Sequence, residues 1–464
     1  MTPPRHVAVI DIGKTNAKLA LVDLRRLEEV AVLTRPNRVL PGPPWPHFDT
    51  EGHWQFLLDA LKTLHQQHGI DAISITTHGA SIVLIDTAGD LAAPILDYEH
   101  PIPGDIASDY DSLRPPFAET GSPRLAGGLN AGAQLHYLFT RDPGLRDRTA
   151  HIIGYPQYWG YRLTGALAND VTSMGCHTDL WDPQARRFSS LVSDLGISDK
   201  MAPVKQSDEV LGRLLPGISA ATGLSPDTPV VCGIHDSNAS LYPHLLAQTG
   251  PFSVVSTGTW VIVMAIGAPR TPLDPRRDTL VNVNAMGDPV PSARFMGGRE
   301  FEIIQDGHPF APSAQDAADV LSQNVMLLPA VEPETGPFQG QEMRWHGPPP
   351  ASGTGQRSVA LAYYLALMTD SCLALTGAAG PTIVEGPFAQ NPHFLAMLAA
   401  ATGRPVLQSQ TTTGTSIGAA LLYGGSDALP SSLPTPTQGT ATSLATYAAK
   451  WKRVGTPWPT GRTR

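Results

Sequence analysis

The sequence predicts an α/β protein with two similar domains, and three observations support this prediction. Residues 6–23 (HVAVIDIGKTNAKLALVD) form an apolar run, a glycine-containing turn and a second apolar run. Residues 252–267 (FSVVSTGTWVIVMAIG) repeat this order in the second half of the chain. The length of 464 residues suffices for two large domains. We place the boundary near Gly233, which gives domains over residues 1–233 and 234–464.

The first segment predicts a hairpin whose tip is rich in polar groups. Residues 6–11 contain β-branched side chains that suit a buried strand, residues 12–16 supply the turn, and residues 16–22 return. A nucleotide polyphosphate with hydrated Mg²⁺ needs backbone N–H groups, cations and a carboxylate. The candidate Mg²⁺ ligand is Asp11, and the candidate phosphate-binding residues are Gly13, Lys14, Thr15, Asn16 and Lys18. The alternatives are a turn-forming aspartate and solvated lysines.

Composition narrows the class of protein and its partners. The chain has 42% hydrophobic and 16% charged residues, which is typical of a globular protein, and a formal net charge of −9. This charge argues against nucleic acid or an anionic membrane as the main partner, but not against ATP at a local positive site. Cys176, Cys232 and Cys372 lack metal-ligand spacing, so we expect a cytoplasmic protein without disulfides. The apolar stretch 359–379 contains Asp370, which favours a buried core helix over a membrane span.

The remaining patterns predict helices and strands in both halves of the chain. Apolar residues at helical spacing, and short apolar runs bounded by turn residues, mark these elements. The expected helices cover residues 54–64, 155–163, 236–246, 359–375, 392–402, 416–423 and 440–452. The expected further strands cover residues 71–76, 81–86, 230–235, 382–385 and 406–410.

Four short blocks, in this order along the chain, resemble the FGGY family of carbohydrate kinases. Residues 11–16 (DIGKTN) are similar to the family's first phosphate motif, in the form seen in rhamnulose- and fuculose-kinase-like members. Residues 233–239 (GIHDSNA) are similar to the block that carries its catalytic aspartate. Residues 256–260 (STGTW) and 418–420 (GAA) are similar to its second phosphate motif and its C-terminal stretch. The resemblance, to rhamnulokinase-, fuculokinase- and xylulokinase-like members, implies two ribonuclease-H-like domains of the actin and sugar-kinase type with an interdomain cleft.

The resemblance also implies roles for individual residues in both domains. Asp236 would accept the hydroxyl proton of the acceptor as the P–O bond forms, and so would contact the acceptor as a general base. Together with Asp11 it would hold Mg²⁺. A helix N-cap after the strand 230–235 is an alternative role for Asp236 that is compatible with the first. The cofactor ATP would be bound in the second domain by Thr257, Gly258, Thr259, Gly386 and Asn391.

The adenosine motif departs from the family pattern, which usually begins with two or three glycines and reads GGGxxN. Residues 385–391 read EGPFAQN, so Glu385 and Pro387 stand on either side of Gly386 where the family has glycine. Glycine is used where a ligand approaches the backbone closely. A changed nucleotide preference therefore remains an alternative.

The contacts with the sugar are expected in the first domain. The residues between two expected strands, and a segment near residue 97, lie where the family places substrate contacts. The candidate substrate-binding residues are His78, Gly79, Ala80, Asp97, Tyr98 and Asp236. A structural role is the alternative for a lone histidine such as His78. Trp54 is a further candidate, with core packing as its alternative. Arg299, in a second-domain loop that resembles a family segment near the cleft, is another, with a plain surface position as its alternative.

The resemblance implies an ATP-dependent kinase that transfers the γ-phosphoryl group to a hydroxyl of a ketose such as rhamnulose, fuculose, xylulose or ribulose. A glycerol or sugar-acid kinase of the same family is one alternative. A non-catalytic regulatory protein that binds nucleotide and sugar is another, and a filament- or chaperone-like ATPase of the same fold group is a third. The expected cofactors are ATP and Mg²⁺, the expected partner is a small-molecule sugar, and a homodimer is a further expectation.

Overall fold

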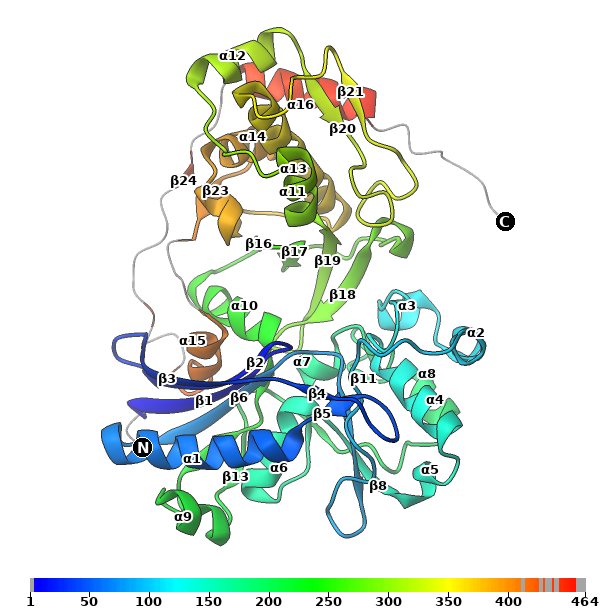
Figure 1. Cartoon of the computed structure of the whole chain (residues 1–464), viewed down its shortest axis with the longest axis vertical. Helices are drawn as coiled ribbons and strands as arrows, with labels where there is room; N and C mark the ends of the chain where they lie inside the picture. Colours follow the sequence, from blue (N-terminus) through cyan, green and yellow to red (C-terminus); the bar gives the residue numbers. More distant parts are fainter. Residues whose placement is uncertain (1–3, 410–413, 425–428, 430–435, 438–441, 456–464) are drawn as a thin grey trace. The chain divides into compact units, whose positions relative to one another are not determined.

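The chain folds into two compact units, shown in Figure 1. The computed structural model describes residues 4–409, 414–424, 429, 436–437 and 442–455. Unit 1 comprises Met1–Gln248, Val281–Pro289 and Thr413–Ser431, and unit 2 comprises Thr249–Leu280, Val290–Thr412 and Ser432–Arg464. The first border of unit 1 lies at Gln248 instead of residue 233. The reason is that α10 (Asp236–Ala247) packs within unit 1 against α15 (Thr415–Ala420).

A seven-stranded sheet forms the centre of unit 1. Its order is β13-β14-β6-β1-β2-β3, and β15 also pairs with β6. Its strands are β1 (His6–Ile12), β2 (Asn16–Asp23), β3 (Glu28–Pro36), β6 (Ala72–Thr77), β13 (Val210–Arg213), β14 (Pro229–Val231) and β15 (Ile234–His235). β1 and β2 form the predicted antiparallel hairpin, with Asp11 opposite Lys18, and β1 runs parallel to β6. The predicted hairpin is therefore confirmed.

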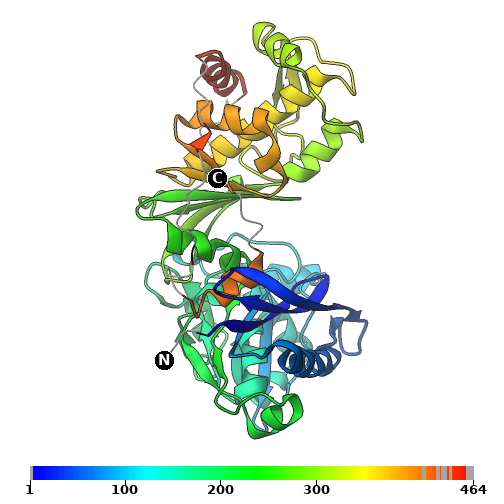
Figure 2. The same cartoon turned by 90° about the vertical axis from the view of Figure 1, so that its left-hand side faces the viewer.

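Helices cover both faces of this sheet. Leu57 and Leu61 of α1 (Thr50–His68) pack with Ile10 of β1 in one hydrophobic cluster. Figures 1 and 2 show α1 running along that face of the strands β1 to β3. Val9 of β1 points to the opposite face, where it packs with Ala419 of α15. The strands at the centre are thus buried on both faces, as their continuous apolar runs predict.

A glycine allows α15 to lie close to α10. A Cβ atom at Gly418 would clash with the carbonyl oxygen of Ala239 in α10. The Ser74 hydroxyl of β6 also donates a hydrogen bond of 2.7 Å to the carbonyl oxygen of Ala419. The block 418–420 is therefore a packing element of unit 1, and its helix ends at Ala420 instead of the predicted residue 423.

The predicted strand 230–235 is divided into β14 and β15. Gly233 separates them with a φ of +93°, and a Cβ atom there would lie 2.8 Å from the carbonyl oxygen of Ile75. The chain then pairs with β6 again, with Ile234 opposite Thr76. Asp236 follows directly and begins α10, so the break places this carboxylate at the end of a strand.

Further elements of unit 1 surround the central sheet. β7 and β8 form a separate two-stranded sheet, and so do β4 and β5. The helices are α2 (Gly104–Leu113), α3 (Phe117–Thr120), α4 (Ala131–Arg141), α5 (Leu145–Arg148), α6 (Tyr155–Thr164), α7 (Val171–Met174), α8 (Ser190–Asp194) and α9 (Pro216–Thr222). The remaining strands are β4 (Val39–Leu40), β5 (His47–Phe48), β7 (Ile82–Asp86), β8 (Thr149–Gly154), β9 (Asn169–Asp170), β10 (Trp181–Asp182), β11 (Arg187–Phe188) and β12 (Val204–Lys205).

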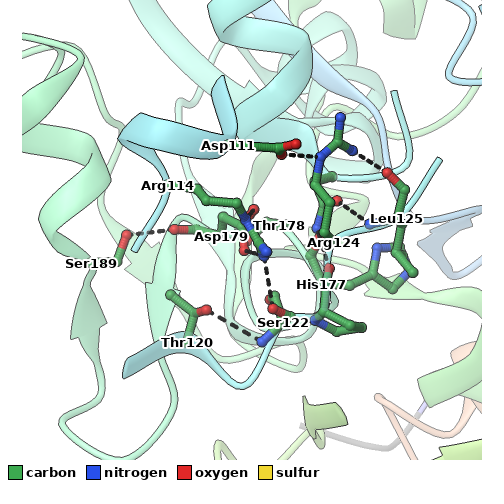
Figure 3. A network of polar contacts seen from close by, with 12 residues as sticks. Asp111, Arg114, Thr120, Ser122, Arg124, Leu125, His177, Thr178, Asp179 and Ser189 are labelled. Carbon is green, nitrogen blue, oxygen red and sulfur yellow. Dashed lines mark hydrogen bonds and ion pairs between the residues drawn. The ribbon is translucent and has the colours of Figure 1, made fainter. Parts of the chain in front are cut away.

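A buried polar network, shown in Figure 3, joins α2 to the segments that follow it. The guanidinium of Arg114 donates to both carboxylate oxygens of Asp179, at 2.8 and 3.2 Å, and to the carbonyl oxygen of Ser122 at 2.8 Å. The hydroxyl of Tyr110 in α2 donates to the same carboxylate. The side chain of Asp179 is fully buried. The network thus satisfies a buried charge with a cation and a hydroxyl group.

Unit 2 is built around a second seven-stranded sheet. Its order is β18-β19-β17-β16-β22-β23-β24. The strands are β16 (Phe252–Thr257), β17 (Val261–Ile266), β18 (Thr279–Val283), β19 (Pro289–Phe295), β22 (Thr382–Glu385), β23 (Val406–Gln408) and β24 (Pro436–Thr437), with β20 (Met326–Leu328) and β21 (Arg344–His346) in a separate pair. β16 and β17 form the second predicted hairpin, and β16 runs parallel to β22. Both hairpins are therefore confirmed.

The helices of unit 2 pack around one long apolar helix. This helix is α13 (Gly355–Leu375), which by length and composition could cross a membrane, but 83% of its most apolar window is buried inside unit 2. It is the core helix that the sequence predicts. The other helices are α11 (Gly297–Gln305), α12 (Ala314–Ser322), α14 (Pro392–Thr402) and α16 (Thr442–Gly455), with two 3₁₀ turns, Pro275–Arg277 and Pro387–Gln390. Residues 410, 440 and 441 of the predicted strand and helix lie outside the described residues.

Candidate active site

Three parallel strands of unit 1 end at the same edge of the sheet. Both β1 and β15 pair with β6, and in the register Asp11 and Ile234 both stand opposite Thr76. Asp11 is the last residue but one of β1, while His78 directly follows β6 and Asp236 directly follows β15. Because the carboxyl ends of parallel strands collect at one edge, these predicted site residues come from three neighbouring strand ends. This edge of the sheet is the candidate active site.

Asp236 is the first residue of α10, with His235 as the N-cap residue. Its Oδ1 accepts a hydrogen bond of 2.6 Å from the Ser237 backbone N–H and lies 3.1 Å from His235 Nε2. The side chain keeps 32% of its surface exposed. The largely buried position of the carboxyl group disfavours its charged form and raises the pKa of Asp236 to about 6. The negative charge of Asp11 acts in the same direction. A carboxylate with a raised pKa that remains accessible is suited to accept a proton near neutral pH.

Asp11 is held by two polar partners. Its Oδ2 accepts a hydrogen bond of 2.7 Å from the Thr415 hydroxyl of α15, and Lys18 Nζ lies 3.2 Å away. Lys18 also contacts Glu29 at 3.2 Å. Among the described residues there is no group of three or more His, Cys, Asp or Glu side chains that could hold a metal ion. Asp11 and Asp236 offer carboxylate oxygens, which Mg²⁺ binds together with water ligands, and their role as its ligands stays a prediction.

The structure separates the two lysines of the first hairpin. Lys14 Nζ forms an ion pair with Asp97, lies 3.0 Å from Glu99 Oε2, and sits 4.6 Å from the centre of the Tyr98 ring. It therefore joins the predicted sugar residues, whereas Lys18 joins Asp11. The other predicted phosphate residues of this hairpin, which lie at or beside its tip, are Gly13, Thr15 and Asn16.

His78 lies in an aromatic environment. Its ring centre is 5.0 Å from those of Tyr98 and Tyr155 and 5.2 Å from that of Phe48. Its Nδ1 is 2.8 Å from the carbonyl oxygen of Gly79, and its Nε2 is buried without a hydrogen-bond partner. Burial lowers the pKa of His78 to about 4, so the ring is uncharged at pH 7.

The residues after His78 support this arrangement through the backbone. A Cβ atom at Gly79 would lie 2.7 Å from His235 Nε2, so glycine allows His235 to pack against the turn. Ala80 has a φ of +60°, and its carbonyl oxygen accepts a hydrogen bond from the Gln134 side chain. Burial also lowers the pKa of His235 to about 4. His235 thus lies between the turn after β6 and the carboxylate of Asp236.

Sequence patterns did not identify Phe48, Tyr155 or His235 as members of this site. Phe48 and Tyr155 contact His78 from elements far away in the chain, and no local pattern marks such contacts. His235 stands directly before Asp236 in the block 233–239, which is a signal that could have identified it. Of the further candidates, Trp54 lies under the guanidinium of Arg162, with 4.5 Å between the guanidinium carbon and the ring centre.

In unit 2, the second hairpin is joined to the predicted adenosine motif. The buried hydroxyl of Thr257 donates to the carbonyl oxygen of Glu385 and accepts a hydrogen bond of 3.1 Å from the backbone N–H of Phe388. Gly258 and Thr259, at the hairpin tip, are exposed. Asn391 accepts hydrogen bonds from two backbone N–H groups, at 3.1 and 3.2 Å, as the N-cap of α14. The nucleotide-binding roles of these residues stay predictions.

Gly386 has a structural requirement for glycine. Its φ is +78°, and a Cβ atom there would clash with the carbonyl oxygen of Thr257. We expect Gly386→Ala to destabilise unit 2 by about 1–3 kcal/mol, because the substitution combines left-handed backbone strain with a backbone clash. Urea unfolding followed by circular dichroism measures this change. Gly403→Ala is the matched control, since its φ is +64° but no atom lies within 4 Å of an added Cβ. A cost no larger than that of the control would contradict the clash.

Glu300 is a fully buried carboxyl group in α11, beside the exposed candidate Arg299. It accepts a hydrogen bond of 3.2 Å from the Glu332 backbone N–H. Burial raises the pKa of Glu300 from 4.5 to about 8, so the group is neutral at pH 7. Arg299 pairs at 3.6 Å with Glu302 and at 3.7 Å with Glu332.

We expect the free energy of unfolding to fall by about 1 kcal/mol between pH 7 and pH 9 because of Glu300. Its folded-state pKa is raised, so the stability gained is complete below pH 4.5 and is lost as the pH rises through 8. Urea unfolding at both pH values measures the loss, and Glu300→Gln should abolish it. Glu302→Gln, which changes an exposed carboxylate on the same helix, should leave it unchanged. An identical loss in Glu300→Gln would show that other groups cause it.

Comparison with known proteins assigns the chain to a family. The family model described as "FGGY family of carbohydrate kinases, N-terminal domain" matches residues 6–242, and "Carbohydrate kinase FGGY, C-terminal domain" matches residues 249–431. A carbohydrate kinase from Novosphingobium aromaticivorans has a crystal structure that is 36% identical, with a TM-score of 0.89 over 97% of this chain and 100% of that one.

More distant relatives share parts of the sequence or only the fold. L-fuculokinase of Escherichia coli (strain K12) is 26% identical over 278 residues, which are 56% of this chain and 57% of the relative. The matched region thus spans little more than half the length of that curated relative. Gluconate kinase from Lactobacillus acidophilus shares the fold, with a TM-score of 0.77 at 16% identity over 97% of this chain and 96% of that one. The predicted family and two-domain fold are therefore confirmed, and the chain belongs to the FGGY family of carbohydrate kinases.

Proposed function

We propose that the chain is an ATP-dependent kinase that transfers the γ-phosphoryl group to a hydroxyl of a ketose sugar. The observation that carries this proposal is the position of Asp236 directly after β15, at the edge of the sheet where Asp11 lies near the end of β1 and His78 follows β6. In such a transfer the acceptor hydroxyl loses its proton as the new P–O bond forms. The raised pKa and partial exposure of Asp236 suit the role of proton acceptor.

Each unit would contribute one set of contacts. In unit 1, the candidate acceptor contacts are His78, Gly79, Ala80, Asp97 and Tyr98, and the ring of His78 offers an unpaired nitrogen. In unit 2, the candidate nucleotide contacts are Thr257, Gly258, Thr259, Gly386 and Asn391. Mg²⁺ held through Asp11 and Asp236 would neutralise charge on the phosphates. Lys18, beside Asp11, would add a cation to the same region.

The experiment is a coupled assay of ADP release with ATP, Mg²⁺ and a panel of ketopentoses, ketohexoses, polyols and sugar acids. We expect ADP release that depends on a ketose. Binding of ATP and sugar without ADP release would favour the regulatory alternative. ADP release that is independent of any sugar would favour an ATPase of the same fold group.

A further inference from the structure

Lys14, Asp97 and Glu99 form a group of charges that we call the lysine cluster. The ammonium of Lys14 pairs with both carboxylates, and the contact with Glu99 Oε2 is 3.0 Å long. Its Nζ also lies 4.6 Å from the centre of the Tyr98 ring, which attracts a cation through its π face. One cation therefore faces two anions, and the cluster carries a net charge of −1. The ammonium is already neutralised before any acceptor binds.

His78 presents a hydrogen-bond acceptor beside this cluster. Its Nδ1 lies 2.8 Å from the carbonyl oxygen of Gly79, and because a carbonyl can only accept, Nδ1 carries the ring proton. Nε2 is then an acceptor, and it is buried without a partner. Buried polar atoms are nearly always paired, so this nitrogen is available to accept a hydrogen bond from a bound ligand. A hydroxyl group can donate to it, whereas a carboxylate oxygen cannot.

Asp236 is a further hydrogen-bond acceptor on the side where the sugar would bind. Asp236 is an anion when it serves as the proton acceptor, and its carboxylate faces the same strand ends as His78. Together, the lysine cluster and Asp236 set one cation, Lys14, against three carboxylates, and Lys18 nearby is already paired with Asp11 and Glu29. An acceptor that carried its own carboxylate would add a further negative charge, and none of these described residues offers it an unpaired cation.

We propose that this site selects uncharged polyhydroxylated acceptors and rejects sugar acids, with the lysine cluster as the determinant of that choice. The proposal rests on the proposed function, because it names the substrate class of the same site. The fold does not decide the question, since a gluconate kinase shares it. The hydroxyl groups of a ketose or polyol can donate to His78 and to the carboxylates, and the rings of Tyr98 and its neighbours suit the apolar face of a sugar.

The test measures binding by isothermal titration calorimetry with the full chain. The ligands are rhamnulose, fuculose, xylulose and ribulose, each paired with the sugar acid of the same carbon skeleton. We expect at least one ketose to bind, and its sugar acid to bind at least about tenfold more weakly at low salt. This preference should shrink as the salt concentration rises. Equal or tighter binding of the sugar acid overturns the proposal, and so does the absence of binding by every ligand.

Variants of the cluster test its role. Glu99→Gln removes one anion at a side chain that is 62% exposed, so the fold is preserved. It should move the preference toward the sugar acid, and the double variant with Asp97→Asn should move it further, by on the order of tenfold. Asp142→Asn makes the same chemical change in the exposed pair with Arg148 and should leave the preference unchanged. An unchanged preference in the double variant overturns the role of the cluster. Ketose binding without ADP release would refute the proposed kinase activity but not this selectivity.

Discussion

Asp236→Asn is expected to lower kcat for ketose phosphorylation by about 10²–10⁴-fold, which is the usual contribution of a positioned general base. The asparagine side chain has the same shape, and its oxygen can still accept the hydrogen bond from the Ser237 backbone N–H. It cannot take up the proton that leaves the acceptor hydroxyl. The rate of ADP release at saturating ATP and ketose measures this effect.

Two controls separate catalysis from folding in this experiment. The thermal midpoint of Asp236→Asn should equal or exceed that of the original chain, because the substitution removes a carboxylate whose pKa is raised by burial. Asp142→Asn, in the exposed pair with Arg148, should keep full activity. If Asp236→Asn retains more than a tenth of kcat, another group accepts the proton, and the assignment is wrong.

Asp179→Ala is expected to destabilise unit 1 by about 3–5 kcal/mol. The substitution leaves the guanidinium of Arg114, of which only 14% is exposed, without its carboxylate partner. It also leaves the hydroxyl of Tyr110 without an acceptor. Breaking a buried ion pair costs more than the pair contributes, because the remaining charge stays out of water. Hydrogen exchange of the amides in α2 and α4 under native conditions measures this loss in unit 1 itself.

A double substitution checks the physical reason. Replacing both partners, with Arg114→Met and Asp179→Leu, should cost less than Asp179→Ala alone, because no unpaired charge remains. Asp142→Ala, in the exposed pair with Arg148, should change stability little. A double variant as unstable as Asp179→Ala would show that the loss comes from packing and not from the stranded guanidinium.

Local sequence patterns were sufficient to predict the parts of the fold that depend on neighbouring residues. The two hairpins follow from apolar runs on either side of a glycine turn, and α13 follows from a long apolar stretch. The strand end that carries Asp236 was also predictable, since a buried run precedes it. In each case the signal lies within about twenty residues of the feature.

Contacts between distant segments could not be predicted in this way. The hydrogen bond from Thr415 to Asp11 joins residues 404 positions apart, and α15 packs against α10, β1 and β6 in unit 1 although it follows most of unit 2 in the chain. The separate partners of Lys14 and Lys18 depend on where Glu29 and residues 97–99 lie in space. No spacing within the hairpin contains that information.

The most direct test of the proposed activity is mass spectrometry of the sugar after incubation with the purified chain, ATP and Mg²⁺. We predict that a ketose gains one phosphoryl group, that ADP forms in an equal amount, and that neither product forms at a comparable rate with Asp236→Asn. ADP that forms equally fast without sugar, while every sugar keeps its original mass, would contradict the proposal.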